Sequence, residues 1–456
     1  MKRISLCILF PLLLVHQQLM AQNKSVTIDT LLSRLNQKNL FNGAIVVGQR
    51  DSILLSKGYG YANFSNATPF TSDMPADGGS IAETLTATAI LLLAGQQKLS
   101  LLDSVQQYIP EYPYANTQIW NLLTHSTGGL PDYSYYFEKI PASYVLNVKT
   151  ILSVLNEQKP ALQYKPYTNF SYDSPGFDIA ATIVERVTGE SYQTFLSTNF
   201  FVPLKMNQSF IRPPLLNQWP GERIKGYSYE NDALELADIS DREGFYGGSN
   251  IWFSAQDLYR WGKSFYHQPI LDESLINIIT SWVSIQGKLS QLRLGGWYQG
   301  RNEHAYYYWG SVAGFYSFVY WDAAQQFTIA FVSNTNIPQW VRPQLTSDLI
   351  DIMEGRKEQP IVEPQSEKAQ MQSITGKYTV DKVGPVEIFL KDNSPYLRLQ
   401  NEMEYRILPV DDKTFYAPGL DPWISFHKMQ GFHFQSLLWH TSHSQSVGKR
   451  VSEEVK

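Results

Sequence analysis

The 456-residue sequence contains almost no cysteine, and its single Cys7 lies close to the N-terminus. A disulfide scaffold and a thiolate metal cluster are therefore excluded, because each needs several cysteines. The sequence also lacks runs of lysine and arginine, and acidic residues outnumber basic ones by 42 to 37. This balance argues against a nucleic-acid-binding protein, since phosphate contacts need clustered basic side chains. The apolar content of 43% is typical of a globular protein.

Long apolar runs are absent as well, except for residues 4–15, which are almost wholly apolar and follow Lys2 and Arg3. About 12 apolar residues are too few to span a bilayer, which needs roughly 20. A short apolar stretch behind two basic residues, with Ala21 before a cleavage point, is typical of a signal peptide. We therefore predict a signal peptide over residues 1–21 and an exported protein, periplasmic or secreted, with no membrane span after its removal. A buried N-terminal helix is the alternative.

Beyond this segment, strand-like and helix-like patterns alternate along the chain. The patterns predict two strand pairs, 43–48 with 53–58 and 315–321 with 327–333, and two helices, over 81–93 and 177–189. The first of these helices is apolar nearly all round and contains several alanines, which allow close neighbours. We expect it to lie buried at the centre of the main domain and to end at Gly95.

The composition changes near residue 356, where a charged stretch with two prolines and no aromatic residue begins. Such stretches often connect domains, so we predict a linker over residues 356–371. It would join a main domain, residues 22–355, to a small all-β domain, residues 372–456. Short alternating runs separated by turn residues support the all-β prediction for this C-terminal part.

Several segments occur in an order that resembles a known family. They comprise residues 41–44, 58–63, 79–80, 98–101, 122–126, 170–172, 203–206, 247–248, 254–258, 314–315 and 333–334. In this order they resemble the serine β-lactamase and D-alanyl-D-alanine carboxypeptidase superfamily, in particular its esterase-like members related to class C β-lactamases. The resemblance covers roughly residues 35 to 340. It implies an α+β fold of the β-lactamase/transpeptidase type, in which helices flank an antiparallel sheet, with a small β domain appended.

The family's chemistry depends on three motifs, Ser-x-x-Lys, Tyr-x-Asn, and His-x-Gly or Lys-Thr-Gly. The matching segments of this chain are 80–83, 172–174 and 308–310. The resemblance implies catalytic roles for Ser80, Glu83 and Tyr172, which stand at the nucleophile, lysine and tyrosine positions. It implies substrate binding for Ser174, Tyr308 and Gly310, which stand at the asparagine, histidine and glycine positions.

Each motif also departs from the family, and the exchange of lysine for Glu83 matters most. Two unit charges about 4 Å apart interact by roughly 4 kcal/mol at an effective dielectric constant near 20. An anion in place of the cation should therefore raise the pKa of Tyr172 and prevent it from acting as a tyrosinate base towards Ser80. A helix N-terminus still favours an oxyanion at Ser80. The sequence therefore predicts a divergent serine hydrolase homologue that is impaired or inactive.

Other interpretations of the same residues stay open. Ser80 and Glu83 also fit a Ser-x-x-Glu capping box, in which each side chain bonds the other residue's backbone N–H. Glu83 could instead act as a general base. Tyr172 and the aromatic run at 306–309 are also typical of packed core aromatics, and we expect His125 to be structural.

Three functional hypotheses follow. The first is an impaired or inactive hydrolase homologue, which would act as a non-catalytic periplasmic binding protein for a small-molecule, peptide or cell-wall-like ligand. The second is an active esterase, peptidase or amidase that forms an acyl-enzyme on Ser80. The third is an interaction protein whose C-terminal β domain carries the function. We predict no cofactor, no metal site and no nucleic-acid partner, and the sequence does not specify an oligomeric state.

Overall fold

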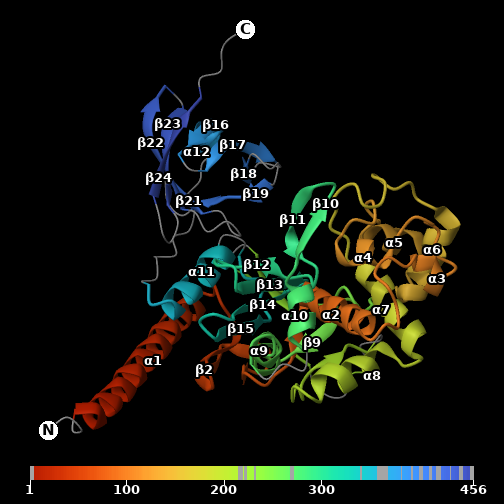
Figure 1. The fold of residues 1–456 in the computed structure, drawn as a ribbon, viewed down its shortest axis with the longest axis horizontal. Coiled ribbons are helices and arrows are strands. Elements are labelled where there is room, and N and C mark those ends of the chain that lie inside the picture. Colours follow the sequence, from red (N-terminus) through yellow and green to blue (C-terminus); the bar gives the residue numbers. More distant parts are fainter. Residues whose placement is uncertain are drawn as a thin grey trace. The chain divides into compact units, whose positions relative to one another are not determined.

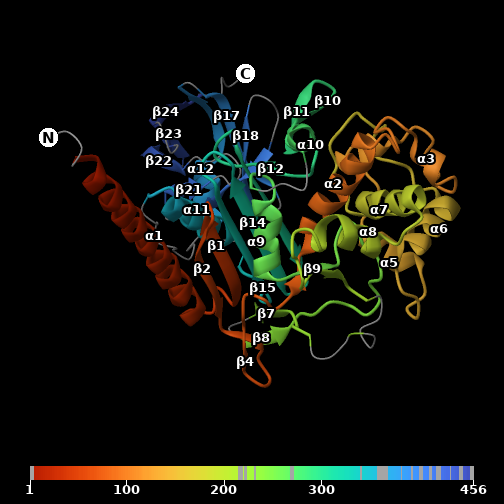
Figure 2. The same ribbon diagram turned by 60° about the horizontal axis from the view of Figure 1, so that its bottom comes forward.

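The computed structural model describes two compact units of the chain, Met1–Ile337 and Pro338–Lys456 (Figures 1 and 2). Residues 357–367, the main part of the predicted linker, lie outside the described residues, so the predicted domain boundaries stay predictions. The described residues are 5–213, 219, 223–230, 233–267, 272–338, 341–356, 368–381, 383–391, 394–399, 404–409, 413–416, 423–431, 433–440 and 445–451.

The first unit combines a large sheet with helices. Its helices are α1 (Ser5–Gln37), the 3₁₀ turn η1 (Gly79–Ile81), α2 (Ala82–Gly95), α3 (Val105–Tyr108), α4 (Ile119–Leu123), α5 (Tyr133–Lys139), α6 (Val148–Gln158), α7 (Pro175–Thr188), α8 (Tyr192–Leu196), the π-helical turn η2 (Ser197–Phe201), α9 (Ala255–Lys263) and α10 (Glu273–Ile279). Its strands are β1 (Gly43–Gln49), β2 (Ser52–Tyr59), β3 (Tyr61–Asn63), β4 (Thr68–Pro69), β5 (Ala76–Asp77), β6 (Phe210–Ile211), β7 (Tyr227–Glu230), β8 (Ala233–Leu236), β9 (Ile251–Phe253), β10 (Trp282–Ile285), β11 (Lys288–Arg293), β12 (Tyr298–Gln299), β13 (Ala305–Val312), β14 (Phe315–Asp322) and β15 (Phe327–Ser333).

The large sheet is antiparallel and has the strand order β10-β11-β12-β13-β14-β15-β1-β2. Both predicted strand pairs are confirmed, as β1 with β2 and β14 with β15. β1 also pairs with β15, so that Gly43 lies opposite Ser333. This pairing joins two segments that are far apart in the sequence into one sheet. It also places β13 two strands away from β15.

Helices flank this sheet, as the family resemblance implies. α9 packs on β1, β14 and β15, and α1 packs on β2. Figure 2 shows α1 on the β2 side of the sheet and the helical region from α2 to α8 on the other side. Residues 5–21 of the predicted signal peptide lie in α1, residues 1–4 lie outside the described residues, and the signal peptide stays a prediction. Among the described residues, every helix is too short or too polar to cross a membrane.

α2 is the central helix that the sequence predicts. Every residue from Ala82 to Leu91 is buried, and the helix packs against α7 and α10. The second predicted helix is α7, which ends at Gly189 with a left-handed φ of +75°. Glu83 is the one ionisable residue in the sequence of α2, so its carboxylate lies inside the core of the unit.

The second unit contains an antiparallel sheet with the strand order β19-β18-β17-β16-β24-β23-β22-β21-β20, as seen in the described residues. Its core includes Tyr378, Phe426, Leu437 and Trp439. The β structure expected at the C-terminus is confirmed. The elements of this unit are α11 (Val341–Met353), α12 (Lys368–Ile374), β16 (Gly376–Val380), β17 (Gly384–Lys391), β18 (Ser394–Leu399), β19 (Glu404–Arg406), β20 (Leu408–Pro409), β21 (Thr414–Tyr416), β22 (Trp423–Gln430), β23 (His433–His440) and β24 (Gln445–Arg450).

Candidate active site around Ser80

Ser80 lies in the tight turn η1, immediately before α2, and is partly exposed. The Asp77 carboxylate accepts a hydrogen bond of 2.8 Å from the Gly79 N–H, and Gly79 has a left-handed φ of +54°. Gly310 of β13 touches the same turn, because a Cβ atom there would lie only 1.8 Å from the Gly78 carbonyl oxygen. This close approach of backbone to backbone holds the Ser80 turn against β13.

The Glu83 carboxylate is the point where the three sequence motifs meet. The side chain is fully buried. Its Oε1 accepts hydrogen bonds from Tyr172 Oη at 2.7 Å and from Ser174 Oγ at 2.8 Å. Its Oε2 accepts a hydrogen bond of 2.5 Å from Tyr308 Oη and lies 3.4 Å from His125 Nε2. Three hydroxyls and one imidazole thus surround a single buried anion, as buried charges require.

The hydroxyl of Tyr172 connects Ser80 to this carboxylate. Tyr172 Oη lies 2.8 Å from Ser80 Oγ and 2.7 Å from Glu83 Oε1. A phenol has one hydrogen to donate, whereas a carboxylate only accepts. When Tyr172 donates to Glu83, the hydroxyl of Ser80 is therefore free to donate to Tyr172. The geometry allows an ordered chain of hydrogen bonds from Ser80 through Tyr172 to Glu83.

His125 completes the surroundings of Glu83, beside the hydroxyls of Tyr172, Ser174 and Tyr308. The residue follows α4 and has a left-handed φ of +49°. His125 Nδ1 lies 3.1 Å from the backbone nitrogen of Asp173 and 3.2 Å from its carbonyl oxygen, while Nε2 faces Glu83. Burial alone would lower the pKa of His125, but the hydrogen bond and charge of Glu83 raise it above the ordinary value. No sequence spacing relates His125 to Glu83, which explains why it was expected to be only structural.

The environment of Tyr172 agrees with the electrostatic argument made from the sequence. Its ring is 47% exposed, but its hydroxyl lies enclosed between Ser80 and Glu83. Burial of the hydroxyl and the charge of Glu83 raise the pKa of Tyr172 well above the usual value near 10. The same two causes raise the pKa of Tyr308. Both phenols therefore stay protonated at neutral pH and serve as hydrogen-bond donors.

The capping-box interpretation of Ser80 and Glu83 is wrong. The N-cap residue of α2 is Ile81, and no side chain bonds the backbone at either N-terminus, that of η1 or that of α2. The physical reason is that η1 runs directly into α2, so the Ala82 N–H already bonds the carbonyls of Gly79 and Ser80. The core-aromatic interpretation holds for the ring of Tyr308, which is buried, although its hydroxyl bonds Glu83.

Within the described part of the chain, no ammonium group takes the place of the missing lysine. The groups that reach the Glu83 carboxylate are the three hydroxyls and the imidazole described above. Lys98 is exposed and lies beyond the C-terminal end of α2, whereas Glu83 lies in its first turn. The charge beside Ser80 and Tyr172 is therefore negative.

Comparison with known proteins agrees with this architecture. The Beta-lactamase family model matches residues 23–350. "Penicillin-binding protein 4*" of Bacillus subtilis (strain 168) is 26% identical over 269 residues, which are 56% of this chain and 59% of that protein. "Teichoic acid D-alanine hydrolase" of Staphylococcus aureus (strain MRSA252) is 28% identical over 229 residues, which are 50% of this chain and 55% of that protein. The matched region thus spans little more than half the length of these two relatives.

A solved structure shows the same fold over most of the chain. The octameric penicillin-binding protein homologue from Pyrococcus abyssi superimposes with a TM-score of 0.64 and 18% identity. This superposition covers 92% of the present chain and 99% of the Pyrococcus chain. Since the family model matches residues 23–350, which are most of the sequence, the chain belongs to the Beta-lactamase family.

Proposed function

We propose that this protein is a serine hydrolase homologue in which hydrolysis is impaired or lost, and that it binds a peptide or cell-wall-like ligand at Ser80. The observation that carries the proposal is the fully buried Glu83 carboxylate, which stands where the resemblance places a lysine ammonium group. Three hydroxyls and an imidazole contact this carboxylate.

Two physical effects of Glu83 oppose acylation of Ser80. A raised pKa keeps the Tyr172 hydroxyl protonated. Tyr172 is therefore not a tyrosinate and cannot act as the base that removes the Ser80 proton. Among the described residues, the carboxylate itself has no direct hydrogen bond to Ser80, so the Ser80 proton can reach it only through Tyr172. Nucleophilic attack needs that proton to leave Ser80.

The ligand class follows from the surface beside Ser80 and from the relatives. The exposed rings of Tyr172 and Phe170 flank the His125 imidazole, with ring centroids 4.5 and 5.5 Å from it, and offer apolar contact next to the partly exposed Ser80. The names of two relatives refer to penicillin and to teichoic acid D-alanine. These names support a D-alanyl-type, cell-wall-like ligand. Together with the predicted signal peptide, they support an exported protein.

A second candidate function is favoured by one specific observation, the chain of hydrogen bonds from Ser80 through Tyr172 to Glu83. In an active enzyme, the Ser80 proton would move to Tyr172 while the Tyr172 proton moves to Glu83. The freed Ser80 oxygen would attack a carbonyl carbon, and the protonated Glu83 would return its proton through Tyr172 to the leaving group. Such an enzyme would be an esterase, peptidase or amidase with a carboxylate base.

Covalent labelling separates the two candidates. We expect a fluorophosphonate probe to label the wild-type protein no faster than Ser80→Ala, whereas Glu83→Lys should label at least tenfold faster because it restores the family's cation. A D-alanyl-D-alanine peptide should bind wild type and Ser80→Ala with similar affinity in calorimetry.

The opposite results point to the second candidate. Wild-type labelling that is lost in Ser80→Ala and also in Tyr172→Phe would establish the proton relay and overturn the proposal. If Glu83→Lys gains no labelling while the peptide still binds, the single charge is not the main obstacle to acylation.

A further inference from the structure

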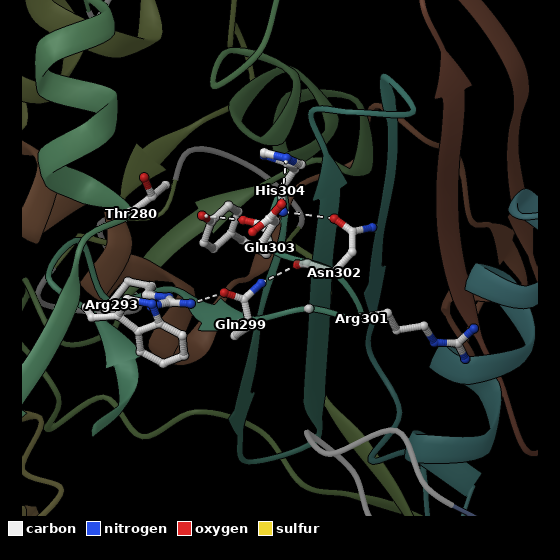
Figure 3. Close-up of a pocket in the computed structure, with 10 residues that line it drawn as sticks. Thr280, Arg293, Gln299, Arg301, Asn302, Glu303 and His304 are labelled. Atoms are coloured by element: carbon white, nitrogen blue, oxygen red, sulfur yellow. Dashed lines mark hydrogen bonds and ion pairs between the residues drawn. The ribbon is translucent and has the colours of Figure 1, made fainter. Parts of the chain in front are cut away.

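A cavity of about 530 Å³ lies at the β10–β13 end of the large sheet (Figure 3). Its size falls in the range of small-molecule pockets. Ser80, Glu83, Tyr172, Ser174 and Tyr308 do not line it, so the cavity is separate from the site described above. Its lining residues are Thr280, Trp282, Arg293, Gln299, Gly300, Arg301, Asn302, Glu303, His304 and Tyr306.

Arg293, at the end of β11, is the unusual residue of this cavity because it is only 2% exposed. Its guanidinium lies over the Trp282 ring, 3.0 Å from the ring centroid, and 5.9 Å from the centroid of Tyr306. Nη2 donates to the side-chain oxygen of Gln299, as Figure 3 shows. Nε and Nη1 have no hydrogen-bond partner among the described residues.

The acidic groups near the cavity are held by other partners. The Glu303 carboxylate lies 3.4 Å from His304 Nε2, and the Asp322 carboxylate accepts from the Asn302 amide at 2.7 Å. No carboxylate of the described residues pairs with Arg293. Burial lowers the pKa of Arg293 to about 10, which still leaves it charged at neutral pH. A buried charge without a counter-ion is costly, and so are buried donors without acceptors.

We infer that this cavity binds a small organic acid whose carboxylate pairs with the guanidinium of Arg293. One buried positive charge matches one negative charge, which favours a carboxylate over a divalent phosphate. Hydrogen bonds between guanidinium and carboxylate are charge-assisted and among the strongest in proteins. The rings of Trp282 and Tyr306 hold the guanidinium in place at the wall of the cavity.

Calorimetry with sodium benzoate at constant ionic strength tests the inference, with benzyl alcohol as a neutral ligand of similar size and inorganic phosphate as the divalent alternative. We expect saturable binding of benzoate, weaker binding of phosphate and no binding of benzyl alcohol. Arg293→Gln should weaken benzoate binding at least tenfold. The control Arg186→Gln removes the same charge from an exposed arginine paired with Glu111, and it should change the affinity less than twofold. Equal binding of benzyl alcohol, tighter binding of phosphate, or unchanged binding by Arg293→Gln would overturn the inference.

A second variant keeps the test valid if Arg293→Gln does not fold. Gln299→Glu is nearly the same size and places an internal carboxylate beside Arg293, where it should compete with the ligand. We expect at least tenfold weaker benzoate binding. Ser80→Ala should keep the wild-type affinity for benzoate. Unchanged binding by Gln299→Glu, or lost binding in Ser80→Ala, would contradict a separate site at Arg293.

Discussion

At the scale of single residues, the exchange of one charge reorganises the neighbourhood of the candidate nucleophile. A lysine at position 83 would donate hydrogen bonds and lower the pKa of a neighbouring phenol, whereas Glu83 accepts them and raises it. Ser174 and Tyr308 both donate a hydroxyl hydrogen to Glu83. Ser174 in place of asparagine and Tyr308 in place of histidine therefore fit Glu83 in place of lysine. Each of the two residues donates a hydrogen bond to the new carboxylate.

The first prediction concerns His125, whose pKa reflects two opposing effects. Burial lowers this pKa and Glu83 raises it, with the Glu83 effect prevailing. We expect Glu83→Gln to lower the pKa of His125, because the variant removes the negative charge that favours the protonated imidazole. Histidine NMR titration of both proteins measures the change.

The control for this prediction is Glu157→Gln. The Glu157 carboxylate also accepts a hydroxyl hydrogen bond, from Ser153 Oγ at 2.6 Å, but it lies in an exposed position of α6. It should leave the His125 titration unchanged. A His125 pKa that does not move in Glu83→Gln would show that the imidazole is not coupled to this carboxylate.

At the scale of elements, the site depends on the contact between η1 and β13. The turn needs Gly79 because of its left-handed φ, and the strand needs Gly310 because the Gly78 carbonyl leaves no room for a side chain. Because backbone atoms touch backbone atoms, a side chain cannot rotate away to relieve crowding here. The position of Ser80 relative to β13 is therefore set by the absence of two Cβ atoms.

The second prediction is that Gly310→Ala destabilises the protein by roughly 1 to 3 kcal/mol, the usual cost of overpacking a tight contact. The new Cβ would lie 1.8 Å from the Gly78 oxygen, so the Ser80 turn must shift. Chemical denaturation followed by circular dichroism measures the free energy of unfolding.

The control is Gly95→Ala at the end of α2, where a Cβ meets nothing within 4 Å. It should be neutral or stabilising by up to about 1 kcal/mol, since alanine favours helix over glycine. Equal effects of the two variants would contradict the contact.

At the scale of the whole molecule, several buried carboxyl groups make stability depend on pH. Burial raises the pKa of Asp173 to about 7 and that of Asp77 to about 6, against an unfolded value near 3.9. The folded state therefore binds more protons than the unfolded state in this range. It follows that the free energy of unfolding falls as the pH rises from about 4 to about 7 through these two groups.

The third prediction is that Asp173→Asn removes part of this decline, because asparagine does not titrate. Between low and neutral pH, the free energy of unfolding should fall less in the variant than in the wild type. The expected difference is roughly 1.4 kcal/mol for each unit by which the Asp173 pKa is raised. Urea denaturation at pH 4.5, 6 and 8 measures it. Asp73→Asn, in an exposed turn, should keep the wild-type profile. Parallel profiles for Asp173→Asn and wild type would contradict the raised pKa.

The sequence by itself determined several of the elements and the choice of most candidate site residues. The hairpin of β1 and β2, the buried helix α2 and the strands β14 and β15 follow from patterns of neighbouring residues, which act locally. The positions of Ser80, Glu83 and Tyr172 followed from the family motifs. The sign of the effect of Glu83 on Tyr172 followed from Coulomb's law alone.

Only the tertiary structure decided how these residues meet. Tyr308 is 225 residues away from Glu83 in the chain, yet its hydroxyl lies 2.5 Å from the carboxylate. The same applies to His125, which the sequence did not connect with Glu83, and to the failed capping box, which depended on η1 preceding α2. The Arg293 cavity likewise needs the packing of β11 against β12 and Trp282. Local propensities act over a few residues, whereas burial and the pairing of buried charges depend on segments that only folding brings together.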